Sequence, residues 1–442
     1  MKKITILVVL SLVILNFTQI TSGEFNSYPE ENNTTFRGYI IKVEENQCNI
    51  TQINTIKLVN ILLKYNVTVY WLCSDLNITT EDLKIENSTE VRFFEKGSYI
   101  ALNTNNYYTD LYIHSWVVYF NNLGYYSTEV YKLIENLSNV KVLKLVEPKI
   151  AITNRSGVNK WWYPYWLDLG WFRNIDLLSY DDIIDDKLMD GYNIISMGGQ
   201  SGSTKDRIID LFNIKHRLIK KKIQEFVRSG GNYIGSCYGA AIAANGTYHP
   251  PGLLYDVQYT PIAANAFKFQ FQLIDRKIYR ALPGGYGNIT GYFKGHNATE
   301  GITVRISNRS NPISFGVPEI IKYNEYASGP VFFEKKIGKS NTDTLAVLVD
   351  IGEGEHCFDI MMHICPFYKS NLIPQFVKDF KIKKWVEFTI GKPVWVTAKY
   401  GDGKVVGFNS HPEFPNTKTP PRILYNAIFY LSSEGPLYVD II

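Results

Sequence analysis

The stretch Asn232-Tyr-Ile-Gly-Ser-Cys-Tyr-Gly-Ala-Ala-Ile-Ala-Ala244 decides how the surrounding chain folds. It begins as an apolar, strand-like run and continues as an alanine-rich, helix-like run, with Cys237 at the change between them. A nucleophile on such a strained strand-to-helix turn needs small neighbours, and Gly235 and Gly239 supply them. The dipole of the following helix favours thiolate over thiol. The spacing predicts a nucleophilic Cys237, and a buried structural cysteine in a tight turn is the alternative.

Strand and helix patterns alternate on the N-terminal side of this turn. Four apolar residues at i, i+4, i+7 and i+8 predict one face of a helix that Gly230 and Gly231 end, namely Ile219, Ile223, Phe226 and Val227. Buried strands are expected at residues 149–152, 177–178, 192–197 and 232–235. Alternation of this kind predicts an α/β fold with a doubly wound, mostly parallel sheet and helices on both faces.

The C-terminal part contains a predicted hairpin and a predicted helix. Residues 394–398 and 405–408 are typical of strands, and Tyr400-Gly401-Asp402-Gly403 lies between them as a turn. Residues from about 255 to 380 are less regular and are expected to contain insertions. A closing helix is expected through Leu424, Ala427, Ile428 and Leu431.

Two further motifs follow predicted strands of the same sheet. Gly198 and Gly199 follow the strand that ends near residue 197, and paired glycines there can turn backbone N–H groups toward a developing oxyanion. His411 and Glu413 follow the last predicted strand. A cysteine nucleophile needs an imidazole as base and a carboxylate to orient it, which this pair supplies. Taken alone, these motifs are also typical of a glycine-rich loop and of a structural histidine.

The three motifs in this order resemble those of the class I glutamine amidotransferase-like superfamily, over residues Lys149 to Leu431. The segment Tyr326-Ala-Ser-Gly-Pro-Val-Phe332 is more specifically similar to the family named for the biotin-protein ligase N-terminal domain. The resemblance implies a flavodoxin-like domain spanning residues 149–442. It also implies site roles: Cys237 as nucleophile, His411 as base, Glu413 as orienting carboxylate, and Gly198, Gly199 and the N–H of Tyr238 at the oxyanion.

The chemical context departs from true amidotransferases, which feed ammonia to a synthetase partner. No Gly-x-x-x-x-Gly-Lys-[Ser/Thr] nucleotide motif is present in the sequence. An exported enzyme would also lose ammonia to solvent. Hydrolysis of an amide or isopeptide bond in a small molecule or peptide, as in the superfamily's secreted γ-glutamyl hydrolases, is the expected reaction, with no cofactor. The alternative is an inactive member that binds peptide or glycan at a surface.

Residues 24–148 are expected to form a smaller α/β accessory domain. Strands at 39–43 and 67–72 flank a helix, so one βαβ unit is predicted. A hairpin is expected from strands at 91–94 and 99–102. This stretch is faintly similar to domains that accompany secreted zinc carboxypeptidases, but it has no His-x-x-Glu metal motif. The helix between the strands at 39–43 and 67–72 is predicted from Ile56, Val59 and Leu63, which lie at i, i+3 and i+7.

Residues 1–23 have the order of a secretory signal: a basic start, an apolar run over residues 4–17 and small, polar Thr21-Ser22-Gly23. An uncleaved anchor is the alternative, but the run is shorter than the ~20 residues that a spanning helix needs. The protein is therefore expected outside the cell or at its surface, with no membrane span after signal removal. Examples of glycosylation acceptor sequences begin at Asn49, Asn66, Asn77, Asn87, Asn136, Asn288 and Asn297. Asn245, close behind the Cys237 turn, is the acceptor least expected to be used.

Composition excludes several classes of protein. With 45% hydrophobic residues among 442, the chain can bury sizeable cores and is not intrinsically disordered. Lys and Arg number 46 against 42 Asp and Glu, and the two signs are mixed along the chain. No long basic tract is present, so no nucleic-acid partner is expected.

An aromatic cluster and the cysteines complete the candidate residues. Trp161, Trp162 and Trp166 follow the first strand of the larger domain, where they would wall a substrate cleft or stack on sugars; packing on the core is the alternative. His356 and His363 beside the last two cysteines suggest a metal, but an exported chain favours disulfides and no metal is expected. The disulfide candidates are Cys48 with Cys73 and Cys357 with Cys365, which leaves Cys237 to react.

Overall fold

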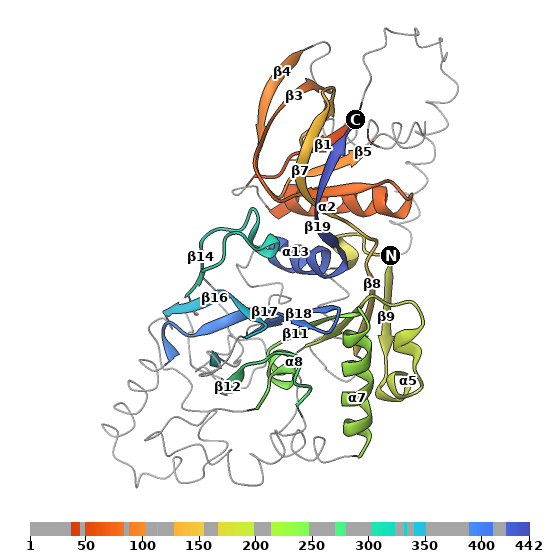
Figure 1. Ribbon diagram of the computed structural model, residues 1–442, viewed down its shortest axis with the longest axis vertical. Helices are drawn as coiled ribbons and strands as arrows, with labels where there is room; N and C mark the ends of the chain where they lie inside the picture. Colours follow the sequence, from red (N-terminus) through yellow and green to blue (C-terminus); the bar gives the residue numbers. More distant parts are fainter. Residues whose placement is uncertain are drawn as a thin grey trace, which may run out of the picture. The chain divides into compact units, whose positions relative to one another are not determined.

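In the computed structural model, residues 37–442 form a compact unit. All residues described below belong to this unit, and Figure 1 shows their helices and strands in colour. The structure describes residues 37–44, 49–83, 88–102, 113, 128–153, 167–198, 214–246, 270–279, 303–322, 331–333, 340–350, 389–409 and 421–442. Within these ranges, no helix is both long and apolar enough to cross a membrane.

The first sheet is antiparallel throughout, and one face of it carries a core that includes Ile40, Ile78 and Phe94, each fully buried. Its strand order is β19-β7-β2-β5-β1-β6-β3-β4. The strands are β1 (Gly38–Ile41), β2 (Val69–Leu72), β3 (Leu76–Asp82), β4 (Thr89–Phe94), β5 (Tyr99–Leu102), β6 (Val130–Leu133), β7 (Leu137–Lys144) and β19 (Glu434–Ile441).

Helix α2 (Asn49–Lys64) connects β1 to β2, as the sequence predicts. The two strands do not pair with each other, because β5 lies between them and runs antiparallel to both. The βαβ unit is therefore split by a third strand. Helix α2 packs against β2 and against α13 (Pro421–Ser432), which explains why Ile56, Val59 and Leu63 are all buried.

The predicted hairpin of residues 91–94 and 99–102 is wrong. Strand β4 pairs with β3, whereas β5 pairs with β1 and β2. The intervening turn is held by tertiary contacts: the Lys96 N–H donates to Asp75 Oδ1 at 2.7 Å, and Trp71 Nε1 donates to the Gly97 carbonyl at 3.0 Å. Gly97 has φ +98°, which glycine adopts without strain. The turn carries the chain across the sheet instead of folding it back on itself.

The last strand of the chain belongs to the first sheet. Strand β19 pairs antiparallel with β7, and Asp440 Oδ1 accepts a hydrogen bond from the Asn139 N–H at 2.7 Å. From sequence, these residues are expected in the larger domain, residues 149–442, with no strand after the closing helix. The first sheet is therefore completed by chain from beyond that helix.

The second sheet is mixed, with the strand order β14-β13-β16-β17-β18-β11-β10-β8-β9. The five strands from β18 to β9 are parallel neighbours, and the four from β17 to β14 are antiparallel. The expectation of a mostly parallel sheet is thus met in only one half. The strands are β8 (Lys149–Thr153), β9 (Asn174–Leu178), β10 (Ile194–Met197), β11 (Asn232–Ser236), β13 (Thr303–Ile306), β14 (Ile320–Lys322), β16 (Thr342–Asp350), β17 (Pro393–Tyr400) and β18 (Gly403–Phe408).

The parallel half has the chain order 2-1-3-4-5, one of the common doubly wound orders. The hairpin β17–β18 and the strands predicted before Cys237 are confirmed. Part of the region interpreted as insertions supplies strands β13, β14 and β16 of the antiparallel half. The remaining short elements are α5 (Tyr180–Ile184), η1 (Lys187–Met189), η5 (Pro312–Ser314), and the separate pair β12 (Lys277–Tyr279) and β15 (Val331–Phe333).

Helices cover both faces of the parallel half (Figure 1). Alternate strand residues such as Ile195 and Tyr233 share a core with Ile223 of α7 (Ile214–Arg228) and Ala243 of α8 (Tyr238–Ala243). Helix α13 packs against β10, β11 and β18 from the other face. The predicted faces of α7 and α13 are confirmed, since their predicted core residues are all buried.

Helix α13 holds its surroundings through buried polar side chains. Arg422 is 4% exposed, and its Nη1 donates to the carbonyls of Glu44 and Gly316 at 2.8 and 3.0 Å. One turn later, Asn426 Nδ2 donates to the carbonyls of Ile313 and Phe315. The helix thereby ties the segment that follows β1 to the segment between β13 and β14.

Lys404 of β18 caps the C-terminal end of α13. Its Nζ donates to the Tyr430 and Ser433 carbonyls at 2.8 and 2.6 Å, where a helix leaves backbone acceptors unsatisfied. Burial lowers the pKa of Lys404 to about 8. Strand β18 is thus fixed to α13 at its start, and its far end reaches Phe408 beside the Cys237 turn.

Candidate active site

Cys237 lies between β11 and α8 with φ 49° and ψ −107°. These angles match the first central position of a type II′ turn, which glycine normally occupies. A side chain bearing a Cβ is strained there by about 1–3 kcal/mol, and such strain is concentrated at functional sites. The Cys237 side chain is half-buried. The turn that the sequence predicts is therefore present, with a cysteine where backbone geometry favours glycine.

The two glycines of the motif are required by close backbone packing. A Cβ on Gly235 would lie 2.6 Å from the Gly239 carbonyl carbon and 2.8 Å from the Ala240 nitrogen. A Cβ on Gly239 would overlap the Met197 carbonyl oxygen at the end of β10. Both obstacles are backbone atoms, which cannot rotate away as a flexible side chain can. This confirms the steric reason for the Gly-x-Cys-x-Gly spacing.

Three hydrogen bonds hold the turn in position. The Cys237 N–H donates to the Phe408 carbonyl at 2.9 Å, and the Ala241 N–H donates to the Cys237 carbonyl at 3.0 Å. The Tyr233 hydroxyl donates to the Gly239 carbonyl at 2.7 Å. Tyr233 is fully buried, and the Gly-x-Cys-x-Gly motif does not identify it as a positioning residue. The signal was available, because a buried tyrosine hydroxyl two residues before Gly235 must find a partner.

Three chain segments leave the sheet side by side at this turn. In the parallel register Met197 lies opposite Gly235, and Ser236 lies opposite Phe408. Gly198, a predicted oxyanion residue, directly follows β10 and is buried. The carboxyl ends of adjacent parallel strands are where doubly wound sheets bind ligands. The structure therefore brings the Gly198 segment, Cys237 and the end of β18 to one edge.

The other predicted site residues lie outside the described residues. This holds for Gly199, for the base and acid His411 and Glu413, for the three tryptophans Trp161, Trp162 and Trp166, and for Cys48, Cys357 and Cys365. Their roles stay predictions. Tyr238 is described as the first residue of α8, so its backbone follows Cys237 directly at the turn.

Cys73 contrasts with Cys237. It carries a free thiol, half-buried after β2, with its sulfur 3.8 Å from the Trp71 carbonyl oxygen. Burial raises the pKa of the Cys73 thiol to about 11, so it stays protonated and weakly nucleophilic near neutral pH. The proposed bridge from Cys73 to Cys48 stays a prediction, because Cys48 lies outside the described ranges.

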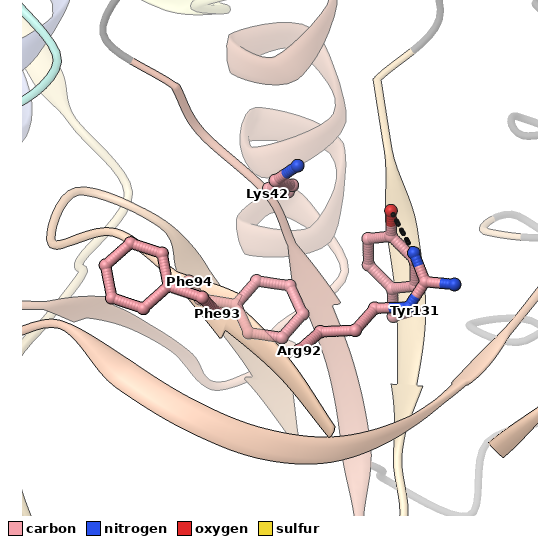
Figure 2. A pocket seen from close by; sticks show the side chains of 5 residues that line it. All are labelled: Lys42, Arg92, Phe93, Phe94 and Tyr131. Carbon is pink, nitrogen blue, oxygen red and sulfur yellow. Dashed lines mark hydrogen bonds between the residues drawn. The ribbon is translucent and has the colours of Figure 1, made fainter. Parts of the chain in front are cut away.

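A polar cavity of about 210 Å³ lies in the first sheet, away from the Cys237 turn, and Figure 2 shows its lining. Arg92 donates to the Tyr131 hydroxyl at 3.3 Å and to Asp82 at 3.1 Å, and its guanidinium stacks over the Tyr131 ring. Lys42 pairs with Glu129, which also accepts from the Tyr131 hydroxyl. Burial and this carboxylate raise the Tyr131 pKa. These cations are already neutralised by carboxylates, so the cluster is best explained as stabilising the sheet.

Among the described residues, no group of three or more His, Cys, Asp and Glu side chains is placed to hold a metal ion. The sequence-based expectation that no metal binds near Cys357 and Cys365 stays a prediction, because these residues lie outside the described ranges.

Replacing Cys237 with glycine should stabilise the fold while removing the thiol. Cys237→Gly relieves the strain at φ 49°, whereas Cys237→Ala removes the thiol and keeps the Cβ. Allowing for the larger unfolded-state entropy of glycine, we expect Cys237→Gly to be about 1 kcal/mol more stable than Cys237→Ala. Urea unfolding of the two variants measures this difference. A glycine variant less stable than the alanine variant would show that the backbone at position 237 is not strained.

Comparisons with known proteins give structural similarity without a sequence match. No family model matches the chain, and no curated protein matches it. A GMP synthase protein from Thermoplasma acidophilum is similar with a TM-score of 0.36 and 12% identity, over 64% of this chain and 94% of that one. The PurLQS structure from Thermotoga maritima is similar with a TM-score of 0.34 and 11% identity, over 65% of this chain and 100% of that one. A ThuA-like protein from Parabacteroides merdae is similar with a TM-score of 0.33 and 9% identity, over 64% of this chain and 88% of that one. Each of these three alignments covers about two thirds of this chain.

Proposed function

We propose that the protein is an exported cysteine hydrolase that cleaves an amide or isopeptide bond through Cys237, His411 and Glu413. The observation that carries this proposal is the backbone of Cys237, a non-glycine residue at φ 49° on a strand-to-helix turn. Two glycines crowded by backbone atoms and three hydrogen bonds maintain that conformation. Strained backbone positions are concentrated at active sites and ligand-binding sites. The signal-like residues 1–23 support export.

The reaction would proceed in two steps through a thioester. His411 takes the Cys237 proton, and the sulfur attacks the substrate carbonyl carbon to give a tetrahedral oxyanion. Backbone N–H groups of Tyr238 and of the Gly198-Gly199 segment would stabilise this oxyanion. The C–N bond then breaks, and the amine leaves with the proton from His411. In the second step His411 deprotonates water, which attacks the thioester and releases the acid and the thiol.

Chain connectivity supports His411 as the base. The Cys237 N–H donates to the Phe408 carbonyl, so the end of β18 touches the turn. Asn409 is fully buried next to it. His411 follows Asn409 by two residues, which keeps their Cα atoms within about 7 Å of each other. This short connection would allow an imidazole at position 411 to reach the thiol, as the proposed role requires.

An electrophilic thiol probe tests the proposal. At pH 7 we expect stoichiometric labelling of Cys237, located by peptide mass mapping, at a rate that falls at least tenfold in His411→Ala. Cys73 serves as an internal control: as a free thiol its raised pKa predicts slow labelling in every variant, and a bridge to Cys48 would prevent its labelling altogether. Equal labelling rates at Cys237 and Cys73, or no effect of His411→Ala, would contradict a catalytic thiol. A screen of γ-glutamyl and isopeptide amides with the same variants then tests turnover against binding alone.

A further inference from the structure

The outer face of the β3–β4 hairpin exposes two large apolar side chains. Val91 is 69% exposed and Phe93 is 53% exposed, and both belong to β4, the strand at the end of the first sheet in the described residues. Proteins usually protect edge strands with charge, proline or a covering segment, because an apolar edge promotes association. Two exposed apolar residues on one edge strand therefore suggest that a further group covers them in the folded protein.

The residues opposite them across the hairpin belong to a glycosylation acceptor sequence. Phe93 lies directly opposite Asn77, and Val91 lies directly opposite Thr79. Ile78 between them is fully buried in the core, so Asn77 and Thr79 face outward with Phe93 and Val91. Side chains directly opposite each other in an antiparallel pair have Cβ atoms about 4.5–5.5 Å apart. Asn-x-Thr is the acceptor pattern for N-linked glycans.

We propose that Asn77 carries an N-linked glycan whose first sugar packs on the Phe93 ring. In the modification, Nδ2 of Asn77 bonds to C1 of an oligosaccharide carried on a polyprenyl diphosphate. The C1–O bond breaks, the diphosphate leaves with its electron pair, and the amide loses one proton. The apolar C–H face of a pyranose fits the negative face of an aromatic ring. This inference goes beyond the proposed hydrolysis and rests only on the export included in that proposal.

Asn77 is better suited to this role than Asn245. The Asn245 Nδ2, the atom that would carry the sugar, already donates to Asp275 Oδ1 at 3.3 Å. Asn77 is exposed on a strand whose partner offers an aromatic platform. A bulky polar glycan there would cover Phe93 and also hinder another strand from pairing with the edge of β4. Asn136, exposed between β6 and β7, provides a matched acceptor sequence in a turn.

The test is expression of the full chain in a glycosylating secretory cell line behind a standard secretion signal. Glycopeptide mass spectrometry should find Asn77 occupied in most secreted molecules. Thermal unfolding of wild type, Thr79→Ala, Phe93→Ser and the double variant then measures coupling. Thr79→Ala removes the acceptor sequence and keeps Asn77. We expect it to lower Tm by roughly 1–3 °C when Phe93 is present and to have no effect beside Phe93→Ser.

Two results would overturn the inference: a folded, secreted protein without glycan at Asn77, or a Thr79→Ala effect on Tm that is the same with and without Phe93. Asn136→Gln controls for glycan loss in general, since its effect on Tm should not depend on Phe93. Cys237 labelling in the same preparations separates this test from that of the hydrolase. Failure of the glycan leaves thiol reactivity unchanged, and an inert thiol leaves the glycan result unchanged.

Discussion

Gly239→Ala is expected to lower the free energy of unfolding by about 3 kcal/mol or more and to abolish selective labelling of Cys237. The new Cβ would overlap the Met197 carbonyl oxygen, so either the end of β10 or the start of α8 must move. Movement of α8 also disturbs the Tyr233 hydroxyl bond to the Gly239 carbonyl, which fixes the turn. Urea unfolding and the thiol probe measure the two effects on the same samples.

Gly246→Ala is the matched control for that substitution. Gly246 has φ +94° with open space around its Cβ position, so the change costs backbone strain of about 1–2 kcal/mol without a collision. It should leave Cys237 labelling intact. If Gly239→Ala were no more destabilising than Gly246→Ala, the close packing of α8 on β10 would be wrong.

Arg422→Met should destabilise the protein by about 2–3 kcal/mol, the second large effect. Methionine keeps much of the volume but removes the donors that satisfy the Glu44 and Gly316 carbonyls. The Gly316 carbonyl is buried in this contact and would be left without its arginine donor. Because α13 packs on both α2 and the second sheet, we expect one cooperative loss of stability that circular dichroism follows during urea unfolding.

Arg305→Met is the control for loss of an arginine. Arg305 lies exposed on β13, so its removal should change the free energy of unfolding by no more than about 0.5 kcal/mol. An Arg422→Met variant that unfolds at the wild-type urea midpoint would show that these hydrogen bonds contribute nothing net.

Local patterns predicted the parallel half of the second sheet and the β17–β18 hairpin, but not strands β13, β14 and β16. The helix through Ile223 ends at Arg228, just before the turn at Gly230, and the turn at Gly401 joins β17 to β18. Both features depend on spacing and turn residues within a few positions. The Cys237 turn was predicted for the same reason, since its small neighbours are adjacent in sequence. The base and acid at 411 and 413 stay predictions, and the strained turn is the described part of that site.

Pairings decided at long range were not predictable in this way. The turn at Gly97 resembles a hairpin turn locally, but hydrogen bonds to Trp71 and Asp75 direct it across the sheet. Arg422 gave no motif, because its partners are backbone carbonyls far along the chain. Periodicity reports which face of an element is buried and carries no information on which distant segment buries it.

The return of β19 to the first sheet has a consequence for synthesis on the ribosome. Strand β7 ends at Lys144 and its partner begins at Glu434, so all nine strands of the second sheet are translated between them. At about 5–20 residues per second, the nascent chain holds the β7 edge open for roughly 15–60 s. Strand β7 therefore lacks its β19 partner throughout the synthesis of the second sheet and gains it only when residues 434–441 are available to pair.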